Sequence, residues 1–420
     1  MKRIATVFAA LHLLMVCQTA KATDLQDLIA SLYEGDGITL RRNNDNPAFS
    51  HHAHFTGASL DRLQAISNVI SQVQAPTRAA ATGLTFEFDP VLDDFVRSHT
   101  SLGSIIGERP ETIGMHRWSF GVSFSHSEYD KLNGQNLSSL QVELNHVDIA
   151  GPGPAEPCVS GPPPNCYAFE KDVIRLDMDI DIESRYLAIA AQYGVSSRWD
   201  IGFSLPIIRN KIKIKSVASI INDPSIQYFR GHDLHVFDET NEDHRVDQAR
   251  GSSTGIGDFA LISKYALPDS ETLSMAVQAR LRAPTGDHKN LRGINQYGGD
   301  LMWIAAVKRP LDEALLTVRG NLGVGINAIR GGQDILSYFA GIEYDRSILG
   351  RETGLSAGIM GQLGASHDAL ASIQRHDLTL GFKIRLPRTG LASFGLITPL
   401  NKQGLRSTVT YSAGIEWMLH

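Results

Sequence analysis

The chain has 420 residues and a formal net charge of −6 at pH 7, from 39 Lys and Arg against 45 Asp and Glu. Because acidic residues outnumber basic ones, nucleic acid is a poor candidate for a partner. Hydrophobic residues make up 42% and charged residues 20% of the chain, a composition that excludes extensive disorder.

Residues 1–22 have the features of a secretory signal peptide. A basic start at Lys2 is followed by an apolar run from Ile4 to Val16 and a small-residue cleavage site at Ala22. The run is too short for a membrane-spanning helix, which needs about 20 residues. We therefore predict export through the inner membrane, with a lipid-modified Cys17 as the alternative.

Residues 23–110 mix helical and strand patterns. Asp24 to Tyr33 predicts a short amphipathic helix, and Ser59 to Gln74 has apolar residues at helical spacing. The alternation at residues 84–88 predicts one strand. We assign residues 23–110 to a small N-terminal helical and irregular segment, which either lies in the periplasm or folds into the following domain as a lumen plug. A free periplasmic tail is the alternative.

Alternation of apolar and polar residues dominates the chain from residue 111 onward. Between Trp118 and Phe124, large apolar residues alternate with Ser and Gly. Successive side chains of a strand point to opposite faces of its sheet, so each such segment has one apolar and one polar face. The clearest segments of this kind are 118–125, 199–207, 277–283, 382–386 and 409–417.

This pattern predicts an all-β fold, in which residues 111–420 form an antiparallel transmembrane β-barrel. In a barrel every backbone group is hydrogen-bonded within a closed sheet, while apolar side chains meet lipid and polar ones line a wet lumen. A secreted β-sandwich or β-helix is the alternative, but it rarely needs Arg and Lys opposite the apolar face of so many strands. The final strand, from Val409 to Trp417, resembles the segment that the outer-membrane insertion machinery recognises.

Turn signals predict about 12 strands, with about 10 or 14 as the alternatives. Short predicted turns alternate with longer connections, as in bacterial barrels, whose turns are short on the periplasmic side and long on the outer side. The predicted outer connections include 208–255 and 284–297. The segment from Leu137 to Ile149 is either a hairpin within an outer loop or two further crossings.

Cys158 and Cys166 flank a proline-rich stretch in the outer segment between about residue 129 and residue 171. In an exported protein this arrangement predicts a disulfide that closes a surface loop, with two free thiols as the alternative. Neither interpretation gives the two cysteines a catalytic role.

Two sets of charged residues form the candidate site. A row of acids alternates with apolar residues between Leu176 and Glu183. If the apolar row faces lipid or the outer rim, the acids point into the lumen, toward basic residues of other strands. A position above the membrane is the alternative, because the segment from Asp172 to Tyr193 exceeds the ~9–11 residues that a strand needs to cross. We predict either a transverse field at a constriction or a salt-bridge network that closes a narrow barrel. The lumen or constriction candidates are Asp177, Asp179, Asp181, Glu183, Arg280, Arg282, Lys383 and Arg385.

The sequence has no recognisable catalytic, cofactor or metal site. His51, His52 and His54 are closely spaced, but no Cys, Asp or Glu lies at a companion ligand spacing, so a solvated loop is favoured. Ser, His and Asp are not arranged recognisably for nucleophilic catalysis, and glycine-rich phosphate loops are absent. We therefore predict that the protein is not an enzyme and binds no cofactor.

Several motifs resemble those of one bacterial outer-membrane family. Gly255-Ile256-Gly257-Asp258-Phe259 precedes Pro284-Thr285-Gly286-Asp287 along the chain, and residues 108–114 and 193–200 carry further similar stretches. Over residues 80–420 the chain resembles the family named for the meta-pathway of phenol degradation, often described as transporters. The resemblance implies an outer-membrane barrel that passes small, hydrophobic or aromatic compounds.

Pattern and resemblance together predict a passive channel or transporter in the outer membrane of a Gram-negative bacterium. Its expected partners are outer-membrane lipid, small-molecule solutes and the outer-membrane insertion machinery. A structural or surface-interaction barrel with a closed lumen and no transport is the alternative.

Overall fold

The computed structural model describes residues 24–32, 38–40, 55, 86–89, 94–97, 107–145, 172–221, 235–237, 243–268, 270, 272–329, 333–364, 373–386 and 390–419. The predicted signal peptide, the helical pattern at 59–74, the three closely spaced histidines, and both Cys158 and Cys166 lie outside these described residues.

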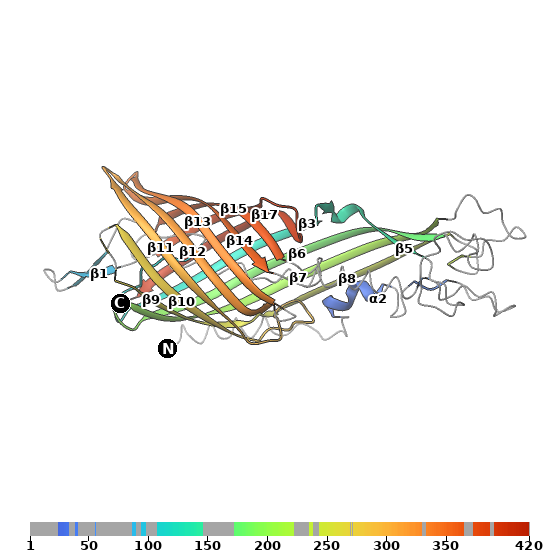
Figure 1. Ribbon diagram of the computed structural model, residues 1–420, viewed down its shortest axis with the longest axis horizontal. Coiled ribbons are helices and arrows are strands. Elements are labelled where there is room, and N and C mark those ends of the chain that lie inside the picture. Colours follow the sequence, from blue (N-terminus) through green and yellow to red (C-terminus); the bar gives the residue numbers. More distant parts are fainter. Residues whose placement is uncertain are drawn as a thin grey trace, which may run out of the picture.

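Among the described residues, twelve antiparallel strands form a closed barrel (Figure 1), which confirms the predicted architecture and strand number. The sheet runs from β3 to β17 and then through the preceding strands to β6, whose pairing with β3 closes the ring. The barrel strands are β3 (Trp118–Leu132), β6 (Val173–Gly194), β7 (Trp199–Ile221), β9 (Phe259–Ala266), β10 (Leu273–Ala283), β11 (Gly298–Leu311), β12 (Ala314–Ile329), β13 (Gln333–Ile348), β14 (Arg351–Gly364), β15 (Ile373–Arg385), β16 (Gly390–Pro399) and β17 (Leu405–Leu419).

Large apolar side chains point outward from the barrel strands. Trp118 and Phe203 are 44% and 37% exposed, whereas their small polar neighbours Ser119 and Ser204 are buried. This inside-out distribution is that of a barrel whose outer surface meets hydrocarbon. Within the described residues, no helix has the length and apolar character needed to cross a membrane.

Short turns gather at one end of the barrel. β17 ends at Leu419, opposite Trp118 at the start of β3, and the turn between β6 and β7 lies at the same end. Longer connections such as residues 284–297 leave from the other end. By the usual arrangement of bacterial barrels, we call the first the periplasmic end and the second the outer end.

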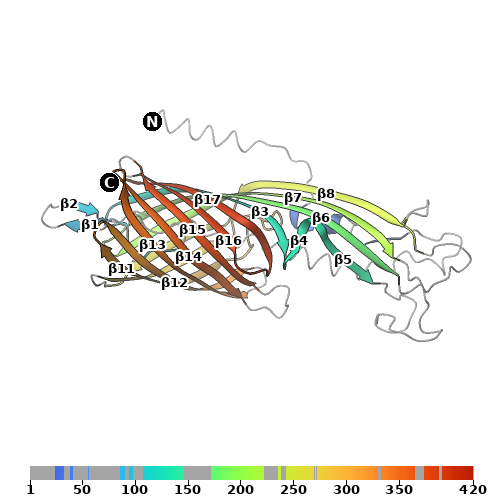
Figure 2. The same cartoon turned by 90° about the horizontal axis from the view of Figure 1, so that it is seen from above.

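Part of the sheet continues beyond the barrel at the outer end (Figures 1 and 2). It consists of β5 (Leu140–Asn145), the outer halves of β6 and β7, and β8 (His244–Ile256), in that order. We call this sheet the outer extension. The prediction that residues 208–255 form a connection is wrong for residues 208–221 and 244–255, which belong to β7 and β8. The segment near Leu137 holds β4 (Gln135–Asn136), η4 (Leu137–Ser139) and β5, and adds no crossing.

The two faces of β7 exchange polarity where the strand leaves the barrel. Ile207 ends the apolar run of the outward row, and the next four outward residues, from Arg209 to Lys215, are basic. Ile212 and Ile214 on the inward face are buried, at 1% and 3% exposure. Because water replaces lipid around the outer extension, its apolar residues turn inward and form a core.

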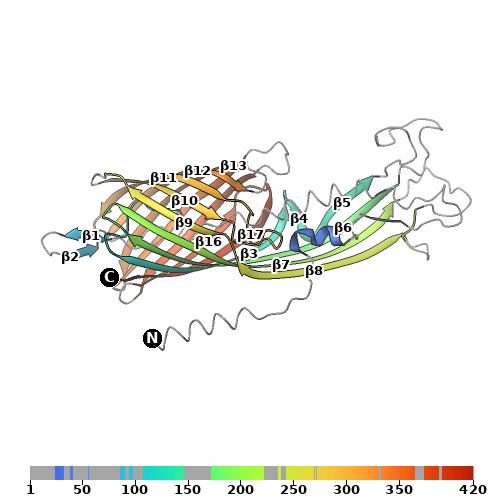
Figure 3. The ribbon, with the colours of Figure 1, turned by 90° about the horizontal axis from the view of Figure 1, so that it is seen from below.

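N-terminal residues complete this core (Figure 3). The predicted helix is present as η1 (Leu25–Asp27) and α2 (Leu28–Ser31), which lie on the inner face of the outer extension. The strand predicted at residues 84–88 is β1 (Phe86–Asp89), which pairs with β2 (Asp94–Arg97) and leaves the barrel count even. The core residues include Leu25, Leu28, Ile29, Leu32, Leu144, Ile174, Leu176, Met178, Ile180, Ile182, Ile212, Ile214 and Leu291.

Candidate functional site

The candidate site is the periplasmic half of the lumen, where charged side chains face inward from the barrel wall. Asp200, Lys264 and Gln278 are paired in register across β7, β9 and β10, so their side chains share the inner face. Lys264 is only 2% exposed. Ionisable residues of a membrane sheet tolerate such burial when they face an interior with polar partners. Other buried polar residues of this region are Lys308, Arg319, Asn321, Glu343, Lys383 and Glu416.

Residues 107–114, ahead of β3, lie inside this lumen; together with residues 115–117, which lead into β3, we call them the lumen segment. The backbone N–H of Glu108 donates to Oδ1 of Asn321 at 2.8 Å, and Nδ2 of Asn321 donates to the carbonyl of Glu108 at 2.9 Å. Gly107 lies against the ring of Phe339, and a Cβ there would come within 2.6 Å of that ring. With its φ of +90°, position 107 therefore requires glycine.

Ion pairs from Lys308 and Arg280 join the lumen segment to the wall. Nζ of Lys308 lies 2.7 Å from Oε1 of Glu111, and Nη2 of Arg280 lies 3.5 Å from Oε1 of Glu108. Burial by itself would raise the pKa of Glu111, but Lys308 and Arg319 lower that pKa to about 2. Glu111 is therefore ionised at neutral pH and keeps its partner.

Arg109 carries a positive charge into the middle of the lumen. Its side chain is 1% exposed, and its carbonyl accepts a hydrogen bond from Nζ of Lys264 at 3.4 Å. Burial lowers the pKa of Arg109, while the nearby acids Glu111, Glu416 and Asp200 act in the opposite direction. An arginine in this position stays protonated. Arg109 therefore belongs to a network of positively and negatively charged side chains.

The lumen segment is also fixed where it enters β3. The backbone N–H of Ile113 donates to Oδ2 of Asp200 at 3.0 Å. Gly194, at the end of β6, passes so close to the carbonyl oxygen of Gly114 that a Cβ at Gly194 would lie 1.8 Å from it. Any side chain at Gly194 would push the segment away from the wall.

At the outer end, the connection 284–297 folds back onto the break between β8 and β9. Oδ1 of Asp258 accepts a hydrogen bond from the backbone N–H of Gly286 at 3.0 Å, and Oγ1 of Thr285 donates to the carbonyl of Gly257 at 2.7 Å. These residues belong to the two motifs on which the family resemblance rests. In this structure the two motifs meet, and their contacts fix the outer connection in place.

The same connection reaches the N-terminal residues. Leu291 is 2% exposed and belongs to the apolar core that contains Leu25. Its carbonyl accepts a hydrogen bond from Nδ2 of Asn210 at 2.6 Å, and the backbone N–H of Gln26 donates to the carbonyl of Lys289 at 2.9 Å. The N-terminal helix and the connection 284–297 therefore meet at the outer end of the barrel.

The predicted basic residues all project from the inward rows of β10 and β15. Arg280 contacts the lumen segment, and Lys383 is 1% exposed. The other two pair within the wall: Nε of Arg282 lies 3.8 Å from Asp258, and Nη1 of Arg385 lies 2.8 Å from Glu352.

The predicted acids lie on the outward face of the outer extension, which corrects the expectation that they point into the lumen. The apolar residues between them are buried in the extension core, so the acids face solvent. Asp181 pairs with Lys213 at 3.3 Å, and Glu183 and Asp179 lie opposite lysines of β7. Asp177 pairs with Arg175 at 3.4 Å.

Sequence reasoning missed the residues that hold the lumen segment, among them Glu111, Lys308 and Asn321. A usable signal exists for Lys308, which alternates with Trp303, Ala305 and Val307 and so falls on the inner face. No local pattern connects Asn321 to Glu108, since 213 positions separate them.

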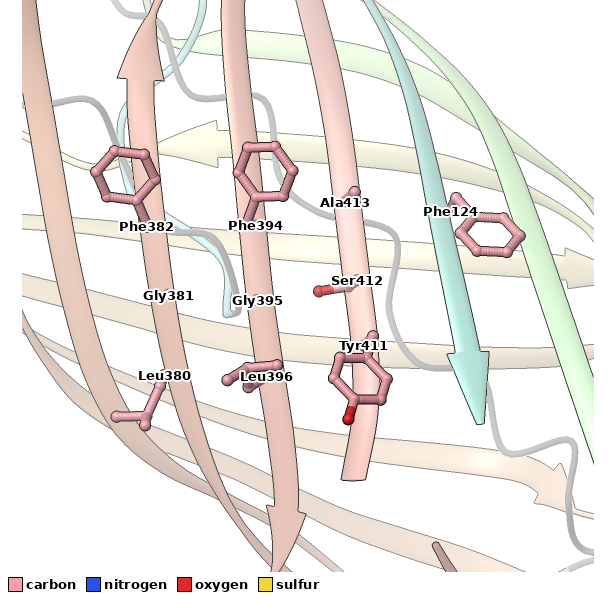
Figure 4. A pocket seen from close by; sticks show the side chains of 10 residues that line it. All are labelled: Phe124, Leu380, Gly381, Phe382, Phe394, Gly395, Leu396, Tyr411, Ser412 and Ala413. Carbon is pink, nitrogen blue, oxygen red and sulfur yellow. The ribbon is translucent and has the colours of Figure 1, made fainter. Parts of the chain in front are cut away.

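The lipid-facing surface carries a groove of about 510 Å³ on β15, β16 and β17 (Figure 4). Phe382 and Phe394 form one side, Leu380 and Leu396 form the other, and Gly395 lies between them. Because these walls are apolar and point outward, the groove fits hydrocarbon chains better than a polar solute.

No family model and no curated protein matches the chain. Similar solved structures include the COG4313 outer membrane channel from Pseudomonas putida F1, with 14% identity and a TM-score of 0.41 over 74% of this chain and 97% of that one. The KdgM porin has 9% identity and a TM-score of 0.28, over 59% and 98% of the two chains. The CymD monoaromatic hydrocarbon channel has 10% identity and a TM-score of 0.33, over 74% and 91%. Likenesses at this level carry no argument about function, and the family label of the resemblance stays a prediction.

Proposed function

We propose that the protein is an outer-membrane channel for small compounds, which the lumen segment closes at rest. The observation that carries this proposal is that polar contacts hold the lumen segment against the barrel wall. Its contacts with the wall include two hydrogen bonds between Glu108 and Asn321 and ion pairs with Lys308 and Arg280. Water can replace such contacts at a small net cost, because an intramolecular hydrogen bond contributes about 1 kcal/mol. Displacement of the segment then leaves a lumen with polar walls.

We further propose that the solutes are small hydrophobic or aromatic compounds. The inner face of the outer extension is apolar and includes Ile180, Ile182, Ile212 and Ile214. It lies beyond the outer end of the lumen, and α2 is a four-residue helix that covers part of it. These four residues are 1–3% exposed, so a hydrophobic solute arriving from outside would bind this face by displacing the N-terminal residues that cover it, before it reached the charged half of the lumen.

Planar-bilayer recordings test the closing role of the segment. In Glu111→Ala/Lys308→Ala, an ion pair of 2.7 Å between the segment and the wall is lost, so we expect at least a tenfold higher frequency of opening. The matched control is Glu313→Ala/Arg346→Ala, which removes an exposed pair of the same 2.7 Å distance. The control should behave as the wild type.

The same recordings test the solute class. Toluene added to the opened variant should reduce the ionic current, whereas glucose at the same concentration should leave it unchanged. Equal effects of the two solutes would argue against the proposed class while leaving the channel itself intact.

A closed barrel with a structural or surface-interaction role is the second candidate. The outer extension favours it, because the sheet of β5 to β8 projects beyond the barrel with a core of its own. This candidate would be favoured over a channel if neither the wild type nor Glu111→Ala/Lys308→Ala, both folded, conducted current in the planar-bilayer recordings.

A further inference from the structure

The outward faces of four neighbouring strands change from apolar to polar at one level. Phe124 of β3 pairs with Leu187 of β6, Leu187 with Ile207 of β7, and Ile207 with Ile256 of β8. These four residues form one outward-facing apolar row. Since the outward residues nearer the periplasmic end of these strands are also apolar, this row is the outer limit of the lipid-facing surface.

The next outward row is polar on every one of these strands. His126 pairs with Arg185, Arg185 with Arg209, and Arg209 with Thr254. The residues thus stand side by side, two positions along each strand from the apolar row. A row of hydrogen-bond donors directly beside a hydrocarbon-facing row is placed at the level of lipid headgroups.

Arg185 and Arg209 are the unusual pair in this row. Like charges directly opposite each other across two strands are destabilising. Arg185 has a partner on its own strand, Glu183, whose Oε1 is 2.5 Å from Nε of Arg185. Among the described residues, the side chain of Arg209 makes no hydrogen bond or ion pair. An anion between the two guanidinium groups would remove their repulsion.

Cross-strand salt bridges neutralise only some of the charged residues that lie next to this row on the outward face. Lys213 pairs with Asp181 at 3.3 Å, as expected for a solvated sheet face. Arg250 of β8, however, lies opposite Lys213, so a second pair of like charges faces outward. The outward residues from Arg209 to Lys215 on β7 include no acid, and those from Gln248 to Ile256 on β8 include none. The excess positive charge is therefore concentrated on β7 and β8.

We propose that this patch, formed by Arg185, Arg209 and Thr254 with Arg250 beyond them, binds a phosphate group of an anionic lipid of the outer leaflet. Paired strands lie about 4.8 Å apart, so both guanidinium groups can reach one phosphate. Arginine binds phosphate oxygens in a bidentate manner, and the Thr254 hydroxyl adds a donor. The lipid's acyl chains pack on the apolar row below. This inference depends on the barrel's orientation in the membrane and not on whether the barrel conducts.

Lipid retention by the purified full-length protein tests the proposal. Native mass spectrometry in detergent would measure binding of bisphosphorylated lipid A, of dephosphorylated lipid A and of inorganic phosphate. The test variant is Arg185→Gln/Arg209→Gln. The control, Arg175→Gln/Lys215→Gln, removes two positive charges from the same sheet face but farther from the apolar row. Heat-modifiable migration on gels confirms that each variant is folded.

We expect bisphosphorylated lipid A to bind the test variant at least tenfold more weakly than the wild type, and the control within twofold of it. Dephosphorylated lipid A should bind the wild type as weakly as the phosphorylated form binds the test variant. Arg209→Gln alone relieves the opposed charges, so it should fold and bind at least threefold more weakly. Unchanged binding by a folded variant would overturn the proposal. Equally tight binding of inorganic phosphate would identify a soluble-anion site and overturn the lipid assignment.

Discussion

Asn321 on β12 satisfies both backbone hydrogen-bonding groups of Glu108 in the lumen segment. Its Oδ1 accepts from the Glu108 N–H at 2.8 Å, and its Nδ2 donates to the Glu108 carbonyl at 2.9 Å. Only a carboxamide offers a donor and an acceptor side by side in a neutral group. Asn321 therefore fixes the segment in place without adding a charge to the lumen.

The first prediction concerns Asn321→Ala. The substitution leaves two buried backbone groups unpaired, at a cost of about 1–3 kcal/mol. Amide exchange in residues 107–117 should therefore accelerate roughly 10–100-fold, since 1.4 kcal/mol corresponds to a factor of about ten. Hydrogen exchange followed by mass spectrometry measures this change. Thr379→Ala is the control, because Thr379 bonds only within the wall, to the carbonyl of Gly358. Equal exchange in both variants would show that Asn321 does not hold the segment.

The second prediction concerns acid. The pKa of Glu111 is about 2 in the folded protein, below its ordinary value of 4.5. A carboxylate with a lowered pKa contributes its full stabilisation above its unfolded pKa and loses it as pH falls through the folded pKa. The opening frequency of the wild type should therefore rise as pH falls from about 4.5 to 2. Glu111→Gln should already open frequently at pH 7 and show no such rise in bilayer recordings. A rise of the same size in Glu111→Gln would assign the acid response to another group.

The third prediction concerns Gly194→Ala. A Cβ at this position would lie 1.8 Å from the backbone oxygen of Gly114, and backbone atoms cannot move aside cheaply. We expect the temperature of unfolding, followed by heat-modifiable gel migration, to fall by roughly 10 °C or more, as for a loss of several kcal/mol. Gly121→Ala is the matched control, since its Cβ would meet Glu416 at an ordinary 3.6 Å. Similar temperatures for the two variants would contradict the close packing seen here.

Strand alternation predicted much of this fold because it depends on local geometry. The apolar row from Trp118 to Phe124 faces outward as expected, and the turn signals gave the correct number of strands. Alternation shows which residues share a face, but it does not show which face is inside. In β6 the row around Ile180 and Ile182 has the same period as the lipid-facing rows, yet it packs into a core above the membrane. The acids next to it therefore point outward.

The change of polarity along β7 is the sequence signal that would have shown which face is inside. Ile207 and Ile208 are consecutive apolar residues on opposite faces, and the outward residues from Arg209 to Lys215 are all basic. Such an inversion marks the point where a long strand leaves the hydrocarbon. Considered without it, the charged residues that follow are equally typical of a loop, which is why residues 208–255 are predicted as a connection. The contacts of the lumen segment could not be predicted in this way, because residues far apart in sequence form them.

The fourth prediction follows from the location of the acids. Asp179→Asn/Asp181→Asn should leave the cation-to-anion permeability ratio of the opened Glu111→Ala/Lys308→Ala variant unchanged, because both acids face solvent outside the lumen. Arg280→Gln should shift the ratio toward cations, because Arg280 faces the lumen. Reversal potentials in a salt gradient report the ratio. A large shift from the Asp variant alone would place the acids on the conduction path.

Tryptophan fluorescence in bilayers tests the central claim, that the apolar face of this barrel meets lipid. The chain has four tryptophans, and Trp118, Trp199, Trp303 and Trp417 all point outward, at 44%, 42%, 47% and 44% exposure. In bilayers of brominated phosphatidylcholine, most of the emission should be lost relative to unbrominated lipid, while iodide in the aqueous phase should have little effect. Emission that iodide quenches and brominated lipid does not would place these side chains in water and contradict the account.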